Sequence, residues 1–465
     1  MNRQFALCGK LLLMACMAVC FTQTVFAGSG NEAVKSVNHK GYNTVAPENT
    51  LPAFELSAGK GYKYVETDIS FTRDGVPVLL HNSNINVMAR NPDGSELAQE
   101  DIEIGTLTYE EVLQYDFTKG MTGYKGTKIA RLDDFLDLCR TKSLHPYLEL
   151  KNNGDYSMDQ IRGLVKLVRQ KGMEGKVSWI SFEARYLKWV REENPKARLG
   201  FLNIVSDEET MKKSVKVAKD LKTSENEVFL DLANKTPYVT YDYSLCEKEG
   251  IPVEIWVNDG LNEFMGITER DVLETLDPYV SGATVDKYIY AKPVTELSPG
   301  AFTYNGEVQK PAITVSANGE KLKKGDCELT WPEGCRDAGT YQVTARLRKG
   351  ILAGAGTAEF IIRKSDNMLS VKSRTAKISY RKLKKKSRTL VVSKVIRFKN
   401  KGVGQLTYTA VSNSRKISIN KKTGTVTLKK GIKKGTYKLK VKVRADGNNN
   451  YNAVAKTVTA KIIVK

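Results

Sequence analysis

Histidine is scarce in this chain, with three among 465 residues. Beyond the N-terminal segment, no apolar run approaches the roughly 20 residues that a membrane-spanning helix needs. No glycine-rich fingerprint follows the first predicted strand, and no cysteine spacing resembles that of a zinc site. These absences argue against a membrane-spanning protein, a dinucleotide-binding sheet and a zinc domain. They also make each histidine informative, because imidazole is well suited to acid–base work near neutral pH.

Cysteine is also sparse, and three of the seven cysteines lie within the first 20 residues. Cys139 and Cys246 stand far apart in apolar contexts and are predicted to be buried thiols. Cys327 and Cys335 are eight residues apart. In an exported protein that spacing is compatible with either a disulfide or two free thiols.

The first 27 residues have the pattern of a secretory signal peptide. Arg3 and Lys10 form a positive start, residues 11–21 an apolar segment, and residues 25–27 a small-residue cleavage site. The residues around Cys16 and Cys20 fit a lipoprotein signal poorly, so simple secretion is favoured. We therefore expect an exported protein.

The net charge of +21 is distributed very unevenly along the chain. Residues 1–295 carry 35 basic and 42 acidic side chains, and residues 296–364 carry 10 and 8. Residues 365–465 carry 28 basic side chains against two acidic ones, a net charge of +26. The cationic character therefore belongs to one C-terminal segment, and function has to be argued segment by segment.

Residues 34–292 alternate short β-like runs with helical stretches, which is typical of a parallel sheet with crossover helices. Eight such units in about 260 residues predict an α/β fold of the (β/α)8 TIM-barrel type. An open doubly wound sheet is the alternative. The predicted strands are 34–38, 63–69, 146–150, 177–181, 197–202, 227–231, 252–257 and 282–285, and the predicted helices include 132–142, 158–171, 184–193 and 207–218.

One further run, at 76–80, follows a turn signal at residues 72–75. It is predicted to be a hairpin strand appended after the second barrel strand. The segment 82–128 is rich in Gly, Asn and Asp and is long for a barrel loop. Long loops at this position often cover a site.

The sequence pattern changes after Pro293. From there on, short runs of alternating apolar and polar residues are broken by Gly, Asn and Pro. We predict two small all-β sandwich (Ig-like) modules, at 296–364 and 366–465. Lysines alternate with apolar residues over 437–443, so one face of that strand is expected to be apolar and the other cationic. The predicted strands are 312–315, 341–347, 357–362, 390–395, 407–411, 425–428, 437–443 and 458–464.

Acidic side chains stand at the ends of two predicted barrel strands, where the active sites of this fold lie. Glu66 and Asp68 close the second strand, and Glu149 ends the third. Residues at i and i+2 on a strand share a face. Three converging carboxylates predict one divalent cation, Ca²⁺ or Mg²⁺, with water completing its shell.

Two histidines and two lysines accompany these carboxylates. His39 follows the first strand and His81 follows the appended one, while Lys40 and Lys151 supply positive charge suited to a phosphate. A metal with two imidazoles favours in-line phosphoryl transfer, with one imidazole as base and the other protonating the leaving oxygen. Taken singly, each residue has a plain structural explanation, such as a solvated face or a surface ion pair. Their coincidence at matching strand ends favours a site.

Two other residues are expected to have structural roles. His145 precedes Pro146 in a loop and is interpreted as a bystander. Trp256, at the end of the seventh strand, is expected to belong to the core rather than to form a substrate platform.

The chain also resembles the glycerophosphodiester phosphodiesterases over about residues 34–290. The motifs that carry this resemblance are His39–Tyr42, Ala46–Thr50, Glu66–Asp68, Thr72–Val78, His81, Leu148–Lys151, Ser181–Phe182 and Trp256–Asn258. The resemblance implies a TIM-barrel enzyme that cleaves glycerophosphodiesters to sn-glycerol 3-phosphate and an alcohol with Ca²⁺ or Mg²⁺. It further implies His39 and His81 as the acid–base pair, metal ligands at Glu66, Asp68 and Glu149, and Lys151 near the phosphate.

Three positions depart from the family pattern. Lys40 stands where the family usually has arginine, which keeps the charge but loses the bidentate fork on phosphate. Asn82 replaces the usual aspartate after His81, and the final Thr-Asp motif reads Thr284-Val285-Asp286. These departures motivate an alternative from another class, a catalytically weak barrel kept as a cell-wall-binding or adhesion protein.

The two C-terminal modules resemble Ig-like repeats of secreted and surface proteins of Gram-positive bacteria, through the motifs 302–306, 338–341, 422–426 and 434–437. The cationic segment 366–465 would then hold the protein on anionic wall polymers, such as teichoic acid, or on membrane headgroups. A solvated spacer is the other interpretation. Nucleic acid is not expected as a partner, because aromatic residues for base stacking are sparse there.

Overall fold

Residues 34–285 contain a closed eight-stranded parallel barrel in this computed structural model, which describes residues 34–151, 156–236, 239–257, 259–411 and 415–465. The strand order is β1-β2-β6-β7-β8-β9-β10-β11, and pairing of β11 back to β1 closes the ring. The predicted signal peptide and Asn258 lie outside the described residues. The closure excludes the open doubly wound alternative.

All eight predicted barrel strands are confirmed, with ends that differ by a few residues. The barrel strands are β1 Lys35–Asn38, β2 Tyr64–Phe71, β6 His145–Leu150, β7 Ser178–Ser181, β8 Arg198–Asn203, β9 Val228–Ala233, β10 Val253–Trp256 and β11 Val280–Val285. The appended strand β3, Pro77–Leu79, is also confirmed and pairs antiparallel with β2.

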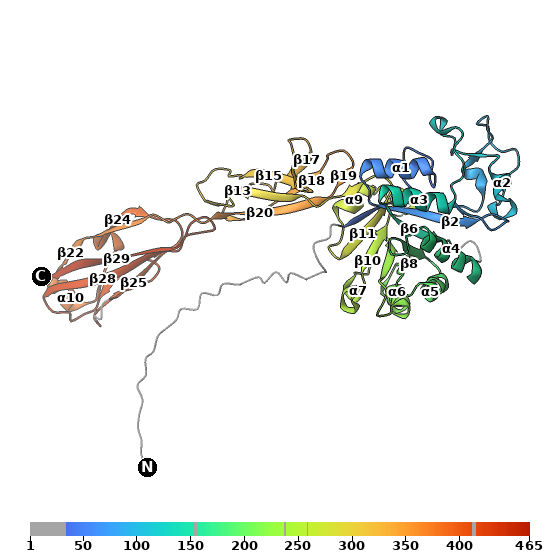
Figure 1. The fold of residues 1–465 in the computed structure, drawn as a ribbon. Helices are drawn as coiled ribbons and strands as arrows, with labels where there is room; N and C mark the ends of the chain where they lie inside the picture. The colour runs from blue at the N-terminus through green and yellow to red at the C-terminus, as the bar shows by residue number, and fades with distance from the viewer. Residues whose placement is uncertain (1–33, 152–155, 237–238, 258, 412–414) are drawn as a thin grey trace, which may run out of the picture. The chain divides into compact units, whose positions relative to one another are not determined.

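Helices follow the barrel strands and lie around them (Figure 1). They are α1 Leu51–Lys60, α3 Leu132–Lys142, α4 Met158–Gln170, α5 Ala184–Glu193, α6 Glu208–Leu221, α7 Ser244–Glu249, α8 Asp259–Met265 and α9 Glu269–Glu274. Reciprocal capping boxes start α4 at Ser157 and α6 at Asp207. In α4, burial of Ile161, Leu164 and Val168 follows the helical period that puts one stripe against the sheet.

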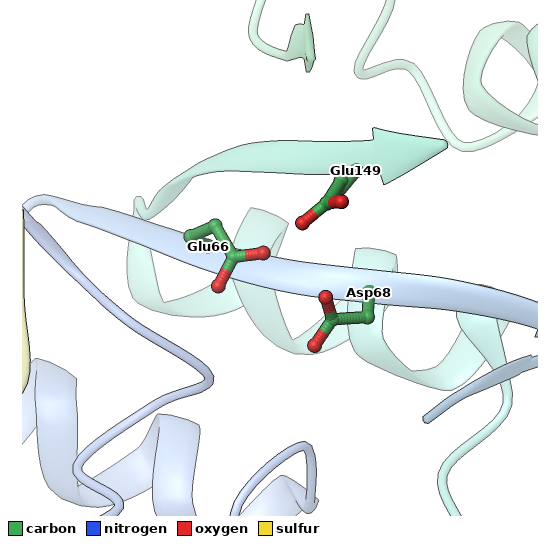
Figure 2. Close-up of side chains that lie close together, drawn as sticks. All are labelled: Glu66, Asp68 and Glu149. Carbon is green, nitrogen blue, oxygen red and sulfur yellow. The ribbon is translucent and has the colours of Figure 1, made fainter. Parts of the chain in front are cut away.

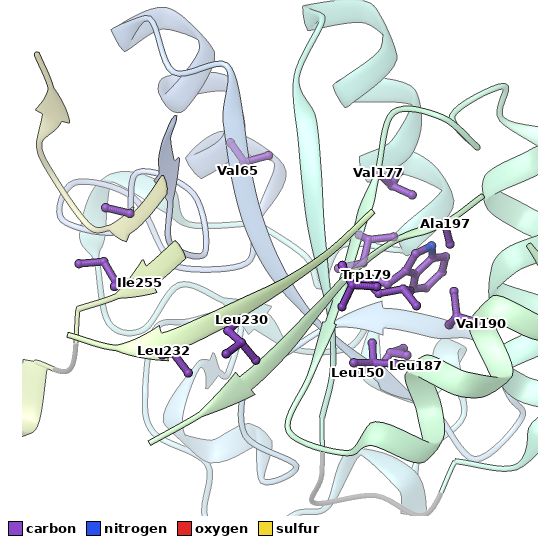
Figure 3. Packing of buried hydrophobic residues seen from close by; sticks show 14 of the residues in the cluster. Val65, Leu150, Val177, Trp179, Leu187, Val190, Ala197, Leu230, Leu232 and Ile255 are labelled. Carbon is purple, nitrogen blue, oxygen red and sulfur yellow. The ribbon is translucent and has the colours of Figure 1, made fainter. Parts of the chain in front are cut away.

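The main hydrophobic core lies between the barrel strands and these helices (Figure 3). Trp179 of β7 is 1% exposed and lies close to Leu187 and Val190 of α5. Strand residues of one parity face this layer, and residues of the other parity face the barrel interior. The interior cluster comprises Val37, Tyr147, Ile180, Leu202 and Phe229.

The segment after β3 folds around a hydrophobic cluster of its own. It contains the short strands β4 Ala89–Arg90 and β5 Asp116–Phe117, and the helix α2 Tyr109–Val112. Ile85, Val112 and Phe117 are buried in this cluster together with Val78 and Leu80 from the appended hairpin. The long loop predicted at 82–128 is therefore a packed insertion.

Beyond Tyr290, most of the regular secondary structure in the described residues is β-strand. Between residues 294 and 363, two sheets share a buried cluster that includes Val343, Phe360 and Ile362. Their strands are β13 Val294–Ser298, β14 Ala301–Thr303, β15 Ala312–Ala317, β16 Glu320–Lys321, β17 Cys327–Thr330, β18 Gly339–Leu347 and β20 Ala355–Arg363. Cys327 and Cys335 are both free thiols, as are the buried Cys139 and Cys246.

The last hundred residues have a separate hydrophobic cluster, which includes Leu439, Val441 and Ile462. The strands are β21 Leu369–Ser373, β22 Thr375–Ile378, β23 Arg388–Leu390, β24 Ile396–Lys401, β25 Leu406–Ala410, β26 Ile417–Ile419, β27 Val426–Leu428, β28 Gly435–Ala445 and β29 Val454–Val464. In β28 buried and exposed residues alternate, so Lys438, Lys440 and Lys442 share one exposed face, as predicted.

Two details of this segment correct the sequence prediction. The strand predicted at 390–395 ends at Leu390, and residues 392–394 form a 3-10 turn, because Val392 and Val395 face the core at a spacing of three. The short helix α10, Tyr380–Lys385, was not predicted, since it has a single buried residue, Leu383, between charged residues and therefore shows no apolar stripe. In the part of the chain that the structure describes, no helix has the length and apolar character to cross a membrane.

Candidate active site

The neighbouring strands β2 and β6 bring the predicted metal ligands together. Asp68 on β2 pairs in register with Glu149 on β6, and Glu66 lies two residues earlier on the same face. One oxygen from each of the three carboxylates lies within 4.8 Å of the other two. Figure 2 shows the three side chains pointing toward one another from the two neighbouring strands. All three residues are buried.

The chemistry of this cluster fits a hard divalent cation. Glu66 Oε1, Asp68 Oδ1 and Glu149 Oε1 are buried, and none of them accepts a hydrogen bond from the residues that the structure describes. Burial, followed by the charges of Asp68 and Glu149, raises the pKa of Glu66 well above its usual value. Burial, followed by Asp68, raises the pKa of Glu149 to about 7 against the opposing charge of Lys151. Buried carboxylates that repel one another are stabilised by a shared cation, and Ca²⁺ and Mg²⁺ take such oxygen ligands.

Lys151 supplies positive charge beside this cluster. Its Nζ lies 3.0 Å from Glu149 Oε1 and 3.3 Å from Asp68 Oδ1. Burial opposes the charge, but Asp68 and Glu149 outweigh it and raise the pKa of Lys151. The Lys151 ammonium therefore stays charged at the edge of the cluster, where it can meet an anion.

Lys40 lies in the tight loop after β1, with a φ of 55°. Its backbone N–H donates to Glu66 Oε2 at 3.1 Å, and its Nζ lies 3.7 Å from Glu48 Oε1. The next residue, Gly41, has a φ of 78°, and a Cβ there would lie 2.8 Å from the Cβ of Ala53. The glycine thus lets the loop lie directly on α1 and brings Lys40 and Glu66 together.

The imidazole of His39 is held by the carboxylate of Asp286, which follows β11, the strand that pairs with β1. His39 Nδ1 lies 2.9 Å from Asp286 Oδ1, just beyond β11. The Asn43 side-chain amide donates to the same oxygen at 2.5 Å and to the backbone oxygen of His39 at 3.0 Å. Because a carboxylate accepts, it favours the proton on Nδ1, and Nε2 lies on the other side of the ring, 4.0 Å from Glu66 Oε2.

Glu269, in the first turn of α9, holds the loop that carries Asp286. Its carboxylate accepts hydrogen bonds from three successive backbone N–H groups, those of residues 286, 287 and 288, at 2.7–3.2 Å. This fixed loop explains how Asp286 keeps its place beside His39.

His81 has a neutral neighbour in place of a carboxylate. Its Nδ1 lies 3.0 Å from Asn82 Oδ1, which can only accept. Burial is the main cause that lowers the pKa of His81, and Lys40 and Lys151 add to it against the attraction of Asp68. The neutral imidazole with a free Nε2 is therefore favoured, which is the form that accepts a proton.

A cavity of about 370 Å³ opens where these groups meet. His39, His81, Glu66, Glu149 and Lys151 line its polar side. The other side is mostly apolar and is formed by Ile180, Phe182, Leu202, Trp256, Val257, Thr284 and the acidic Asp231. A volume of this size fits a small ligand.

Trp256 packs against the core of the barrel interior, as predicted, and it also lines the cavity. Its ring meets that of Phe182 edge to face, with centroids 6.1 Å apart. Its inward position follows from the strand parity that also turns Glu254 inward, which a sequence alone does not fix. His145, in contrast, bonds Ser178 at 2.9 Å and does not line this cavity.

Asp286, Asn43 and Asn49 were not predicted as site residues. Asn49 donates to Asp68 Oδ2 at 2.8 Å and accepts from the Thr67 hydroxyl at 2.7 Å, so it holds a predicted metal ligand. The only signal in the sequence was the position of Asn49 and Asp286 within or beside family motifs. Their contacts with Asp68 and His39 depend on the folded barrel.

The Glycerophosphoryl diester phosphodiesterase family model matches residues 39–240. Residues 39–240, which make up most of the barrel, are thus similar to this family. The matched range contains both histidines, the three carboxylates and both lysines of the site. Asp286 and Trp256 lie beyond its end.

Two relatives of the chain are named glycerophosphodiester phosphodiesterases. Mouse glycerophosphodiester phosphodiesterase 1 is 29% identical over 136 residues, which is 29% of this chain and 38% of that protein. A glycerophosphodiester phosphodiesterase from Caldanaerobacter subterraneus is 25% identical over 36% of this chain and 65% of its own length. The chain thus spans less than two thirds of either relative. A solved glycerophosphodiester phosphodiesterase structure from Agrobacterium tumefaciens covers 55% of this chain and 96% of its own, with 20% identity and a TM-score of 0.42.

Proposed function

We propose that the barrel hydrolyses glycerophosphodiesters to sn-glycerol 3-phosphate and an alcohol. One observation carries the proposal: a cluster of three buried carboxylates lies beside a cavity that two imidazoles and a charged lysine line. These residues fall within the range that matches the family model. The same set of groups favours an enzyme over the alternative of an adhesion protein, since an adhesion surface has no need of a buried cation site.

Glu66, Asp68 and Glu149 would hold one divalent cation, Ca²⁺ or Mg²⁺. When bound, such a cation neutralises the phosphate and stabilises the charge that builds up in the transition state. Lys151, at the edge of the carboxylate cluster, would contact the phosphate oxygens. Lys40 would contribute to the positive potential from its place beside Glu48.

His39 and His81 would divide the proton transfers between them. The Asp286 carboxylate accepts from Nδ1 and orients the His39 ring so that Nε2 is the nitrogen left for proton transfer. His39 would therefore protonate the leaving alcohol oxygen through Nε2. His81, which is favoured as the neutral imidazole, would take a proton from the attacking water.

Turnover by single-residue variants tests this assignment. We expect His39→Asn and His81→Asn each to lower kcat on glycerophosphocholine by at least 10³-fold, since each removes one positioned proton-transfer group. Thermal unfolding should stay close to that of the parent protein, because both side chains line the cavity. Activity within tenfold of the parent in both variants would contradict the assignment.

We further propose that the protein is exported and held at the cell surface by residues 366–465. The support is the signal-like start and the cationic face of β28, where Lys438, Lys440 and Lys442 are exposed together. Across the ladder, Lys438 is paired with Lys461 of β29, which extends the face to the neighbouring strand. Many weak ionic contacts of this kind would retain the protein on anionic wall polymers or headgroups.

Salt dependence tests the retention proposal. The full chain should co-sediment with cell walls that contain teichoic acid at low ionic strength and be released as salt is raised, because exposed charges are screened. A chain with Lys438, Lys440, Lys442 and Lys461 replaced by glutamine should remain in solution. Salt-independent sedimentation, or equal sedimentation of the variant, would contradict the proposal.

A further inference from the structure

A second acidic group in the same cavity has no role in the proposed reaction. Asp231 lies on β9, which stands four strands away from β2 in the ring of eight and hence on the opposite side of the barrel. It lines the cavity and is 1% exposed. Asp231 shares its inward face with Phe229 two residues earlier, so it points toward the barrel axis.

The Asp231 carboxyl lacks a partner within the described protein. Its Oδ1 is buried and accepts no hydrogen bond. The nearby cation, Arg198, donates instead to Glu254, Glu227 and Tyr147. A buried carboxyl without a hydrogen bond is costly, and an apolar side chain would fill this layer without that cost.

The surroundings of Asp231 show what kind of group could satisfy it. Leu202, its neighbour in register on β8, is apolar, as are Ile180 and Phe182 on the same side of the cavity. Trp256 also lines this side, and its Nε1 donor is buried with no acceptor among the described residues. An acceptor and a donor without partners, set in an apolar wall, suit a hydroxyl group, which can both donate and accept.

We propose that Asp231 binds a hydroxyl group of the substrate. The enzyme then selects diesters in which the part that enters the cavity beside Asp231 is a polyol. The proposal rests on the proposed phosphodiesterase function and deepens it. Asp231 acts as a specificity residue, because it lies across the barrel from the carboxylate cluster. The hydroxyl can come from the glycerol portion or from the leaving alcohol.

Paired ligands and paired substrates separate the two sources. Binding of sn-glycerol 3-phosphate is compared with binding of n-propyl phosphate, which lacks both hydroxyls, by calorimetry with the metal-loaded protein. Turnover of glycerophosphoglycerol is compared with that of glycerophosphoethanolamine, whose leaving alcohol lacks extra hydroxyls. Both comparisons are made on the parent, on Asp231→Leu and on Asp231→Asn. Asp220→Leu, the same change at a half-exposed position of α6, is the matched control.

If the glycerol portion is bound, Asp231→Leu should reduce the preference for sn-glycerol 3-phosphate over n-propyl phosphate by about 10- to 100-fold. If the leaving alcohol is bound, the ratio of kcat/KM between the two diesters should fall by a similar factor. Asp231→Asn should keep part of the preference because it retains hydrogen-bonding groups. Asp220→Leu should change neither ratio.

Unchanged ratios in Asp231→Leu, or an equal loss on every ligand with a lowered melting temperature, would overturn the proposal and assign Asp231 to barrel packing. A parent protein that hydrolyses no glycerophosphodiester would instead overturn the proposed function. The comparison of the two phosphates would still decide the role of Asp231 in that case, because it measures binding alone.

Discussion

At the scale of single residues, the site depends on contacts that bring distant parts of the chain together. Asp286 and His39 are 247 positions apart, yet their side chains lie 2.9 Å from each other because β1 pairs with β11. The carboxylates of Glu66 and Glu149 meet in the same way across β2 and β6. The first pairing orients the imidazole of His39, and the second brings together carboxylates that raise the pKa of Glu66.

Asp286→Asn should keep His39 in place but remove the carboxylate that orients its imidazole. An amide can turn its NH2 toward Nδ1 and so favour the wrong tautomer, and we expect kcat to fall by about 10²- to 10⁴-fold. The loss should be accompanied by a change in the pH profile of kcat/KM, which a purely structural effect would not produce. Asp242→Asn is the matched control, since the exposed Asp242 accepts hydrogen bonds from its neighbour Ser244. An unchanged kcat and pH profile in Asp286→Asn would contradict the positioning role.

Glu149 should make cation binding depend on pH. Its pKa of about 7 lies above the value of about 4.5 expected for the unfolded chain, so the metal-free folded state binds the extra proton. The stability that this proton gives is present below pH 4.5 and is lost as the pH rises through about 7. A cation must displace the same proton, so we expect Ca²⁺ to bind about tenfold more weakly at pH 6 than at pH 8.

Isothermal titration at the two pH values measures this difference. Glu149→Gln should bind the cation more weakly at both values and with a smaller pH dependence. A parent protein whose Ca²⁺ affinity is equal at pH 6 and pH 8 would contradict the raised pKa of Glu149.

At the scale of elements, the barrel interior is packed so closely that one position of β8, Gly200, has no room for a larger residue. A Cβ at Gly200 of β8 would lie 2.3 Å from the ring of Phe229 and 2.9 Å from Ile180. Gly200→Ala should therefore destabilise the fold by about 1–3 kcal/mol through overpacking. Gly163→Ala is the matched control, because Gly163 lies on the exposed side of α4 with nothing within 4 Å of a Cβ. We expect that change to stabilise by about 0.5–1 kcal/mol.

Chemical denaturation of the two alanine variants measures both effects. Equal stability of Gly200→Ala and Gly163→Ala would show that the interior can rearrange around Phe229. In that case the layer that holds Asp231 would be looser than the structure indicates.

The elements themselves were largely predictable from the sequence. Barrel strands such as β7 are short apolar runs, and helices such as α3 have a clear apolar stripe, so both were placed within a few residues. The 3-10 turn at 392–394 and the short helix α10 were missed, because local charge and valine content resemble those of the neighbouring strands.

The candidate site was only partly predictable. Glu66 and Asp68 share a strand, so their convergence follows from the i, i+2 spacing. The pairing of His39 with Asp286 requires the closure of the barrel, and the inward position of Asp231 requires the parity of β9. No local pattern carries either of these contacts, and the position of Asp286 beside a family motif does not say which side chain it meets.

At the scale of the whole molecule, the acidic-to-neutral barrel and the basic C-terminal segment are predicted to act together on anionic polymers. A cationic segment that holds a glycerophosphate polymer raises the local substrate concentration at the barrel. Deletion of residues 366–465 should therefore lower turnover of such a polymer by tenfold or more and leave glycerophosphocholine turnover within twofold. This segment has a hydrophobic cluster of its own, which makes the deletion practicable. An equal loss on both substrates would contradict the cooperation of the two segments.

The central claim is that a cation held by Glu66, Asp68 and Glu149 serves a phosphodiesterase with His39 and His81 as its acid and base. Release of sn-glycerol 3-phosphate from glycerophosphocholine, measured before and after chelation and again after Ca²⁺ or Mg²⁺ is restored, tests it most directly. We predict that chelation abolishes turnover by the parent protein and that one of the two cations restores it. The His39→Asn variant should show no such turnover even when the cation is present. A metal-replete protein that releases no sn-glycerol 3-phosphate from any glycerophosphodiester, or one whose turnover is indifferent to the chelator, would contradict the account.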